Sequence, residues 1–343
     1  MHSTFPTVVS IIVPSYHSDK DCLERCLTSI VSQKGHDLAL DCIVVFDGSP
    51  EKDIINLARK FVDVKTIEIE HSGVSSARNE GIAQASGKYL TFVDADDELP
   101  ENALSDLVAY AEQYSCDVVQ GAYDAVLPFS IEHHSYKTKN EVFRGDSLKC
   151  FQRDVLCPDK GLGLAWGKLF RRSFILENEI AFDDEMAVSE DTAFALDACS
   201  RARVIGYIPS VVYRYMRNDS STVSSYRPDY VDRIINSIKH MKNHIEAISD
   251  NAVYRDNFSS YILFHLLLVQ LHYLFNPSAP WSRKERRKKY EETLDCEIFR
   301  LALDSSDYND FPLAKRISLV ALKLRAYQCS RFISFVRRIQ LSR

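Results

Sequence analysis

Short apolar runs alternate with segments of helical spacing over the first 120 residues of the chain. The runs are typical of buried strands and cover residues 8–13, 43–46, 64–69, 89–93 and 117–120. The segments between them carry apolar residues every three or four positions and cover residues 23–31, 53–61, 75–85 and a stretch beginning near 101. Alternation of this kind predicts an α/β fold with a mostly parallel sheet and helices on both faces.

The pattern changes in the rest of the chain. Residues 125–227 mix short strand-like runs, among them 203–208 and 211–216, with helices near 146–155 and from 190 onward. Beyond residue 230 the spacing is mainly helical. We therefore predict a division into residues 1–124, residues 125–228 and a helical C-terminal region, residues 229–343.

The composition is that of an ordinary globular protein, with 45% hydrophobic and 26% charged residues. A net charge of −6 argues against a nucleic-acid-binding protein. Nine cysteines without a C-x-x-C pair favour reduced thiols, and the N-terminus lacks the basic region of a signal peptide. The longest apolar stretch, residues 261–275, is too short to span a bilayer, so we expect a cytoplasmic protein.

The C-terminal end is strongly basic. Residues 311–343, here called the basic tail, contain eight Lys and Arg and no acid, which leaves −14 on the rest of the chain. A second basic run, residues 283–289, follows Trp281. The apolar residues of the tail change phase at Arg331. We predict a helical appendage that rests on the anionic inner face of the cytoplasmic membrane. The alternatives are a packed helix with a solvated basic face and a homodimer contact.

Three carboxylates follow the run at 89–93, namely Asp94, Asp96 and Asp97. Carboxylates this close repel one another, and Mn²⁺ or Mg²⁺ relieves the repulsion while keeping positions for phosphate oxygens. The alternative is a solvated acidic loop in which Asp97 caps the next helix. Because the loop lies at the carboxyl end of a strand, where ligands bind in such sheets, we favour a metal site.

The motifs Pro14-Ser15-Tyr16 and Asp47-Gly48-Ser49 fall at the same edge of the predicted sheet, and further candidates lie elsewhere in the chain. Asp47 can accept a hydrogen bond from a nucleobase, or simply form a turn with the following glycine. Arg78 can pair with phosphate oxygens, or be a solvated arginine. Glu190 and Asp191 can supply a general base, or favour a helix dipole. Trp166 can stack on an acceptor sugar, or pack in the core.

In their order, these motifs resemble glycosyltransferase family 2, which comprises inverting enzymes with the GT-A fold. The resemblance covers about the first 225 residues. It rests on VVSIIVPSY at 8–16, FDGS at 46–49, GVSSARNEGI at 73–82, ASGKYLTFVDADD at 85–97, WGKL at 166–169 and SEDT at 189–192. The chain departs from the family at His17, where Asn is frequent, and at Phe46, where an acid is frequent.

The resemblance implies a nucleotide-sugar-binding half at residues 1–124 and an acceptor-binding half at residues 125–228. It implies that Pro14, Tyr16 and Asp47 hold the nucleobase, usually uracil.

For the diphosphate and the reaction, the resemblance implies that Arg78 lies near the nucleotide. Asp94 and Asp96 form the metal-binding pair, with Asp96 as the direct ligand, and Asp191 is the catalytic base with Glu190 beside it. A further segment with Arg214, Arg217 and Ser221 resembles one that closes over the diphosphate.

We therefore expect an inverting, metal-dependent transfer of a sugar from a nucleotide-diphosphate donor, a UDP-sugar, to a hydroxyl of a saccharide acceptor. If the basic tail binds membrane, a lipid-linked acceptor in bacterial surface-polysaccharide synthesis follows. Two alternatives stay open: a non-catalytic scaffold that assists a partner glycosyltransferase, and a sugar nucleotidyltransferase. The second needs a basic, Gly-rich triphosphate loop after the first strand, where residues 15–18 read SYHS.

Overall fold

The computed structural model describes residues 7–33, 38–217 and 226–341. The chain forms two compact units, which we call the α/β unit (Met1–Val155, Lys160–Asp184 and Ser189–Asn218) and the helical unit (Leu156–Asp159, Glu185–Val188 and Asp219–Arg343). In the described part of the chain, no helix has both the length and the apolar character needed to cross a membrane.

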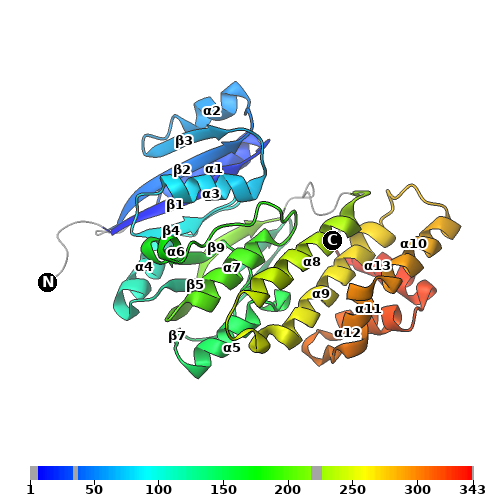
Figure 1. The fold of residues 1–343 in the computed structure, drawn as a ribbon. Helices are drawn as coiled ribbons and strands as arrows, with labels where there is room; N and C mark the ends of the chain where they lie inside the picture. Colours follow the sequence, from blue (N-terminus) through cyan, green and yellow to red (C-terminus); the bar gives the residue numbers. More distant parts are fainter. Residues whose placement is uncertain (1–6, 34–37, 218–225, 342–343) are drawn as a thin grey trace. The chain divides into compact units, whose positions relative to one another are not determined.

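A nine-stranded sheet forms the centre of the α/β unit (Figure 1). Its strands are β1 (Thr7–Ser15), β2 (Leu38–Asp47), β3 (Val64–Ile69), β4 (Tyr89–Phe92), β5 (Val118–Leu127), β6 (Ser130–His134), β7 (Glu141–Phe143), β8 (Lys168–Arg171) and β9 (Ile205–Met216). The order is β3-β2-β1-β4-β8-β5-β9-β7, with β6 beside β5. The first four strands of this order are parallel as predicted, whereas β8 runs antiparallel to β4 and β5, so the sheet as a whole is mixed.

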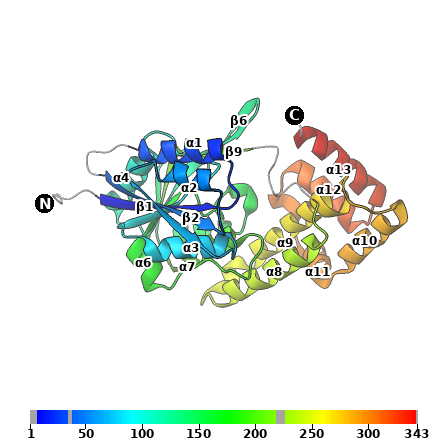
Figure 2. The same ribbon diagram turned by 90° about the horizontal axis from the view of Figure 1, so that it is seen from above.

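Helices cover both faces of the sheet (Figure 2). The face that carries α1 (Lys20–Val31), α2 (Lys52–Ala58) and α4 (Ala103–Tyr114) buries a continuous, mainly aliphatic core. The α1 helix begins where the Asp19 side chain accepts the backbone N–H groups of Asp21 and Cys22. It buries Leu23, Cys26, Leu27 and Ile30, which recur at helical spacing and pack on the sheet.

The opposite face carries α3 (Val74–Gln84), α6 (Arg172–Glu177) and α7 (Glu190–Arg201), while α5 (Asp146–Asp154) packs near β7. Its core is aromatic: Phe194 of α7 stacks on Phe182 at 4.1 Å between ring centroids and meets Phe92 of β4 edge-on at 5.4 Å. Burying one such ring stabilises the fold by roughly 1.5–3 kcal/mol. Because Phe194 lies one turn after Glu190, this cluster fixes the start of α7 against the end of β4.

The strand-like runs at 203–208 and 211–216 are one strand, β9, and not two. Its pairing with β5 shifts register on both sides of Ala122, so the Pro209–Ser210 step is absorbed as an irregularity within the ladder. Proline has no N–H to donate, and an irregularity is one of the places where a strand tolerates it.

The helical unit contains α8 (Tyr230–Glu246), α9 (Arg255–Val269), the π-helical η3 (Gln270–Leu274), α10 (Arg283–Asp295), α11 (Glu297–Ser305), α12 (Leu313–Lys323) and α13 (Tyr327–Leu341). Three short 3₁₀ turns are η1 (Pro158–Lys160), η2 (Asn251–Tyr254) and η4 (Tyr308–Asp310). The predicted helical character of this region is therefore confirmed.

A buried amide ties the basic tail to the rest of the helical unit. The Gln270 side chain donates to the Ser330 carbonyl at 3.1 Å and to Ser334 Oγ at 2.9 Å, and accepts from Ser318 Oγ at 2.8 Å. The apolar spacing of the tail changes phase because the tail is two helices, α12 and α13, and not one. The chain turns between them at Arg325 (φ 51°), upstream of Arg331. Each of these two helices has its own apolar face.

Candidate active site

The position of α3 is set by a close approach to the sheet. A Cβ placed on Gly81 would lie 2.3 Å from Cγ2 of Ile12 in β1, so only glycine allows the observed packing. The side chain of Asn79 further pairs with the backbone of Phe182, with both hydrogen bonds at 2.8 Å. Arg78, directly before Asn79 on the same helix, is thereby held in a fixed direction.

Arg78 is only 3% exposed and contacts three carboxylates. Its Nη2 donates to Asp94 Oδ1 at 2.9 Å, and its Nη1 donates to Asp191 Oδ1 at 2.6 Å and Glu190 Oε1 at 3.1 Å. The guanidinium also lies 5.1 Å from the centre of the Phe182 ring. One buried cation therefore joins the end of β4 to the start of α7, and brings together four residues that the sequence nominated.

These partners differ from the phosphate oxygens expected for Arg78, whose role toward the nucleotide stays a prediction. Sequence alone had no signal for the arrangement, since more than 110 residues separate Arg78 from its partners on α7.

Charge and burial perturb this cluster in opposite directions. Burial alone would lower the pKa of Arg78, but the charges of Asp191, Asp94 and Glu190 raise it overall, so the guanidinium stays protonated. Burial, with the charges of Glu190 and Asp94, raises the pKa of Asp191 above its ordinary value of 3.8, although Arg78 and the backbone N–H of Ala165 oppose the shift. A carboxylate of raised basicity is suited to accept a proton.

Asp97 binds strand β9 and does not cap a helix. Its buried carboxylate accepts Tyr213 Oη–H at 2.6 Å and the Met216 backbone N–H at 2.7 Å, both from β9. The helix that follows, α4, has Asn102 at its N-cap, so the capping alternative for Asp97 is wrong. Burial, followed by the charge of Asp94, raises the pKa of Asp97. The Asp97 bonds clamp the acidic loop to β9.

Within the same loop, Asp96 is the exposed carboxylate. Partial desolvation, followed by the charge of Asp94, raises its pKa. In the described ranges, no three or more His, Cys, Asp or Glu side chains gather to hold a metal ion by themselves. Two carboxylates two residues apart fit Mn²⁺ or Mg²⁺ that takes its remaining ligands from phosphate and water oxygens. The metal site thus stays a prediction with a suitable donor pair.

Asp47 lies at the end of β2 and is buried. Its carboxylate accepts the backbone N–H groups of Ser72 at 2.7 Å and Gly73 at 3.0 Å, and His71 Nδ1 lies 2.9 Å away. The His71 ring stacks on Tyr16 at 4.3 Å between centroids. Sequence reasoning missed His71, because nothing in its local pattern distinguishes it from any other residue before a turn.

The α3 helix connects the two groups of side chains. Gly73, an N–H donor to Asp47, is the N-cap of α3, and Arg78 follows it five residues later. At 1.5 Å per residue this is about 7.5 Å along the helix axis. Pro14 is the second-last residue of the neighbouring strand β1, two positions before Tyr16. The base-side and diphosphate-side candidates therefore share one helix.

The remaining candidates lie around β9. Trp166 is 7% exposed, and its ring stacks on Tyr213 at 4.3 Å, so the geometry matches the core-packing alternative. Tyr213, missed by sequence reasoning, also accepts the Asp94 backbone N–H at 3.1 Å. Arg214 and Arg217 are exposed residues of this region, and the backbone of Arg214 pairs with that of Glu98 beside the acidic loop. Ser221 lies outside the described residues.

Comparison with known proteins gives consistent results. Residues 10–174 match the model of the family described as glycosyl transferase family 2. The chain is 26% identical over 325 residues to an uncharacterized glycosyltransferase, EpsJ, of Bacillus subtilis, with 91% of each chain covered. It is 28% identical over 215 residues to a poly(ribitol-phosphate) beta-glucosyltransferase of Bacillus spizizenii, covering 61% of this chain and 32% of that protein.

Among solved structures, the chain is similar to S. aureus TarS 1-349 in complex with UDP-GlcNAc. The TM-score is 0.65 at 17% identity, and the match covers 97% of this chain and 92% of that one. At this identity the similarity shows the fold alone. With the family match, it confirms the predicted α/β fold of the GT-A type with a helical C-terminal region.

Proposed function

We propose that the protein is a glycosyltransferase of the family whose model residues 10–174 match, and that it moves a sugar from a UDP-sugar to a hydroxyl of a saccharide acceptor with inversion at the anomeric carbon. The observation that carries the proposal is the Arg78 junction, which brings Asp191 and Glu190 within hydrogen-bond reach of the same guanidinium as Asp94. A base and a donor-side carboxylate must lie on either side of one reacting sugar, and this junction holds them that close. A solved structure of the same fold in complex with UDP-GlcNAc supports the choice of donor.

In this proposal Asp191 accepts the proton of the acceptor hydroxyl as that oxygen attacks the sugar. Its raised pKa makes it a stronger base than a solvated aspartate, and Arg78 stays charged and fixes its direction. Glu190 shares Arg78 and keeps the junction anionic. When bound through Asp96 and Asp94, Mn²⁺ or Mg²⁺ supplies positive charge for the diphosphate that departs. Asp47, with Pro14 and Tyr16, takes the nucleobase, while Arg214 and Arg217 offer positive charge to the diphosphate.

The acceptor is the less defined half of the proposal. Two relatives carry names that state transfer to poly(ribitol-phosphate). We propose a saccharide acceptor, lipid-linked, in surface-polysaccharide assembly on the cytoplasmic side of the membrane. The basic tail supports the lipid-linked form, since it offers cations to an anionic surface.

Donor turnover tests the assignment. UDP-sugar hydrolysis with Mn²⁺ would be compared in the wild-type chain, Asp191→Asn and Asp96→Ala, with Asp63→Asn, an exposed acid outside the site, as the matched control. We expect both site variants to lose about 10²–10⁴-fold in rate, the range that a general base or a charge-stabilising group contributes. Wild-type rates in both variants contradict the proposal. Failure of any UDP-sugar to bind by calorimetry favours the non-catalytic scaffold instead.

A further inference from the structure

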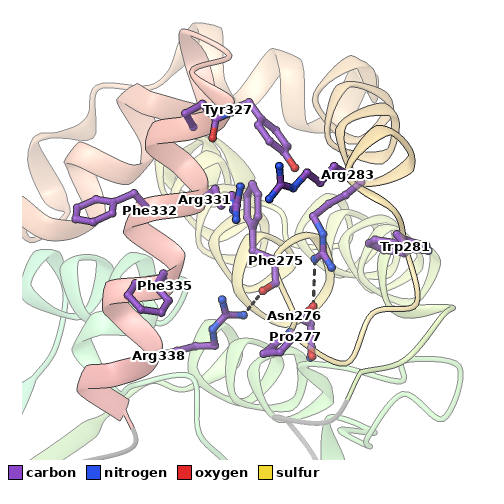
Figure 3. Close-up of a pocket in the computed structure, with 12 residues that line it drawn as sticks. Phe275, Asn276, Pro277, Trp281, Arg283, Tyr327, Arg331, Phe332, Phe335 and Arg338 are labelled. Atoms are coloured by element: carbon purple, nitrogen blue, oxygen red, sulfur yellow. Dashed lines mark hydrogen bonds between the residues drawn. The ribbon is translucent and has the colours of Figure 1, made fainter.

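The helical unit contains a cavity of about 640 Å³ that is separate from the candidate active site (Figure 3). Its wall comes from the segment after η3, the start of α10 and one side of α13. Four arginines line it, and no Asp or Glu among the described residues does: Arg283, Arg286, Arg331 and Arg338. We call it the arginine pocket.

Two of these arginines are held by backbone carbonyls. Arg286 Nη1 donates to the carbonyls of Leu274 at 2.6 Å and Asn276 at 3.1 Å. Arg338 donates to the carbonyl of Phe275, as Figure 3 shows. A carbonyl fixes the direction of a guanidinium without neutralising its charge. The pocket is therefore preorganised and stays positive.

The surrounding charges agree with this description. Burial, followed by the charge of Arg286, lowers the pKa of Arg338. Arg325, outside the pocket, is by contrast paired with Glu291 at 3.0 Å and Asp295 at 2.5 Å. These two acids of α10 pair with Arg325 and not with the arginines of the pocket. The positive charge of the pocket is therefore left for a ligand. Arginine offers a fork of N–H donors that matches a phosphate group.

Apolar side chains next to the pocket face solvent. On α13 they recur at helical spacing with exposed fractions of 66%, 54%, 37% and 40%: Phe332, Phe335, Val336 and Ile339. On α12 and its C-cap residue an equivalent series is 66%, 53%, 44% and 72% exposed: Leu313, Ile317, Val320 and Leu324. In Figure 3, Arg338 points toward the carbonyl of Phe275, and Phe332 extends away from it on α13. Phe332 and Phe335 also line the pocket, so the apolar series is continuous with it. An apolar series on a surface helix normally faces a core, so these faces are made for contact with a nonpolar partner.

We propose that the arginine pocket receives the phosphate group of an anionic membrane lipid, while the exposed apolar faces of α12 and α13 lie in the lipid interface. Charge complementarity selects this occupant: the basic tail carries +8 without a single acid, as a negative leaflet requires. Helices that lie in a membrane interface carry cationic residues together with aromatic or branched apolar residues, and α13 has this composition. The proposal does not depend on the transferase function.

Vesicle flotation of the full-length chain tests it. We expect binding to phosphatidylcholine vesicles that contain phosphatidylglycerol, and little binding to phosphatidylcholine alone. The double variant Arg283→Gln/Arg331→Gln, which spares the two carbonyl-bound arginines, should lower the partition coefficient about 25-fold, roughly fivefold for each cation removed near the surface. Arg255→Gln/Arg300→Gln removes the same charge from exposed positions outside the pocket and should keep wild-type binding.

The apolar half of the proposal has its own variant, Phe332→Ser/Phe335→Ser, which should lose vesicle binding while its circular dichroism and donor hydrolysis stay at wild-type level. Equal losses in both arginine pairs overturn the pocket, because they indicate attraction by net charge alone. Binding of soluble glycerol 3-phosphate as tight as binding to vesicles overturns the membrane as the source of the phosphate. Reversible dimerisation that the Phe332/Phe335 variant abolishes, without vesicle binding, assigns the apolar faces to a second copy instead.

Discussion

Substitution of Arg78 by methionine tests the physical basis of the candidate site. Methionine retains most of the side-chain volume but leaves Asp94, Asp191 and Glu190 without their shared cation. Removing one member of a buried ion pair costs about 3–5 kcal/mol, because the remaining charge stays in a low-dielectric environment. We therefore expect Arg78→Met to lower the free energy of unfolding of the α/β unit by about 3–5 kcal/mol near pH 7.5.

The loss should shrink at lower pH. Burial and the neighbouring carboxylates raise the pKa of Asp191, and without Arg78 it rises further. An acid whose pKa is higher in the folded than in the unfolded state binds more protons when folded, so stability increases as the pH falls. Between pH 7.5 and pH 5 the variant should therefore recover part of its deficit relative to the wild type.

The assay is urea unfolding followed by tryptophan fluorescence. The chain has two tryptophans, so Trp281→Phe in the background leaves Trp166 as a reporter of the α/β unit alone. Arg59→Met is the matched control, since its side chain is 60% exposed and lies 3.8 Å from Glu68, an arrangement that contributes about 0–1 kcal/mol. A deficit of Arg78→Met that equals this control, or that does not change with pH, refutes the reasoning.

Further outcomes follow from single contacts. Gly81→Ala forces Ile12 or α3 to move and should cost about 1–3 kcal/mol, which Ile12→Ala partly restores in a double-mutant cycle. Burial would raise the pKa of Asp41, but hydrogen bonds from Lys65, Ser10 and Ser86 lower it from 3.8 to about 2. Asp41 therefore contributes about 2 kcal/mol to the free energy of unfolding above pH 4, and this contribution disappears toward pH 2. Asp41→Asn should remove the corresponding difference between melts at pH 7 and pH 3. Burial lowers the pKa of His265 from 6.5 to about 4, so the helical unit should lose stability from pH 6.5 downward, measured through Trp281, and His265→Gln should flatten that slope.

The sequence predicted the first half of the fold well because its strands are continuous apolar runs that only a sheet covered on both faces can bury. The strand β3 occupies the predicted residues 64–69, whereas β2 begins at Leu38 and β5 continues to Leu127, beyond the apolar run in each case. Asp41 and Asp124 interrupt the apolar pattern in these extensions, but the ladder continues through them because backbone hydrogen bonds do not require apolar side chains. The irregular β9 was predicted as two runs instead of one strand, since Pro209 interrupts the side-chain pattern but not the ladder.

The candidate site was only partly predictable. Carboxylates at strand ends stand out by position, which explains why Asp47, Asp94 and Asp96 were nominated from sequence. The contacts that orient them come from side chains without such a signal, namely His71, Tyr213 and the side of Arg78 that faces α7. Whether a polar residue points to a ligand or to another residue depends on tertiary packing, so one-dimensional spacing cannot distinguish the two.

The Gln270 amide has a practical consequence for any attempt to separate the basic tail from the rest of the chain. Its partners Ser318, Ser330 and Ser334 all belong to the last two helices. Deleting those helices therefore leaves the Gln270 amide in an apolar interior without its hydrogen-bond partners. A shortened chain would then fail for reasons of folding, whatever the tail does at a membrane. Substitutions on the outward-facing side of α13 are for that reason the sounder way to ask what the C-terminus is for.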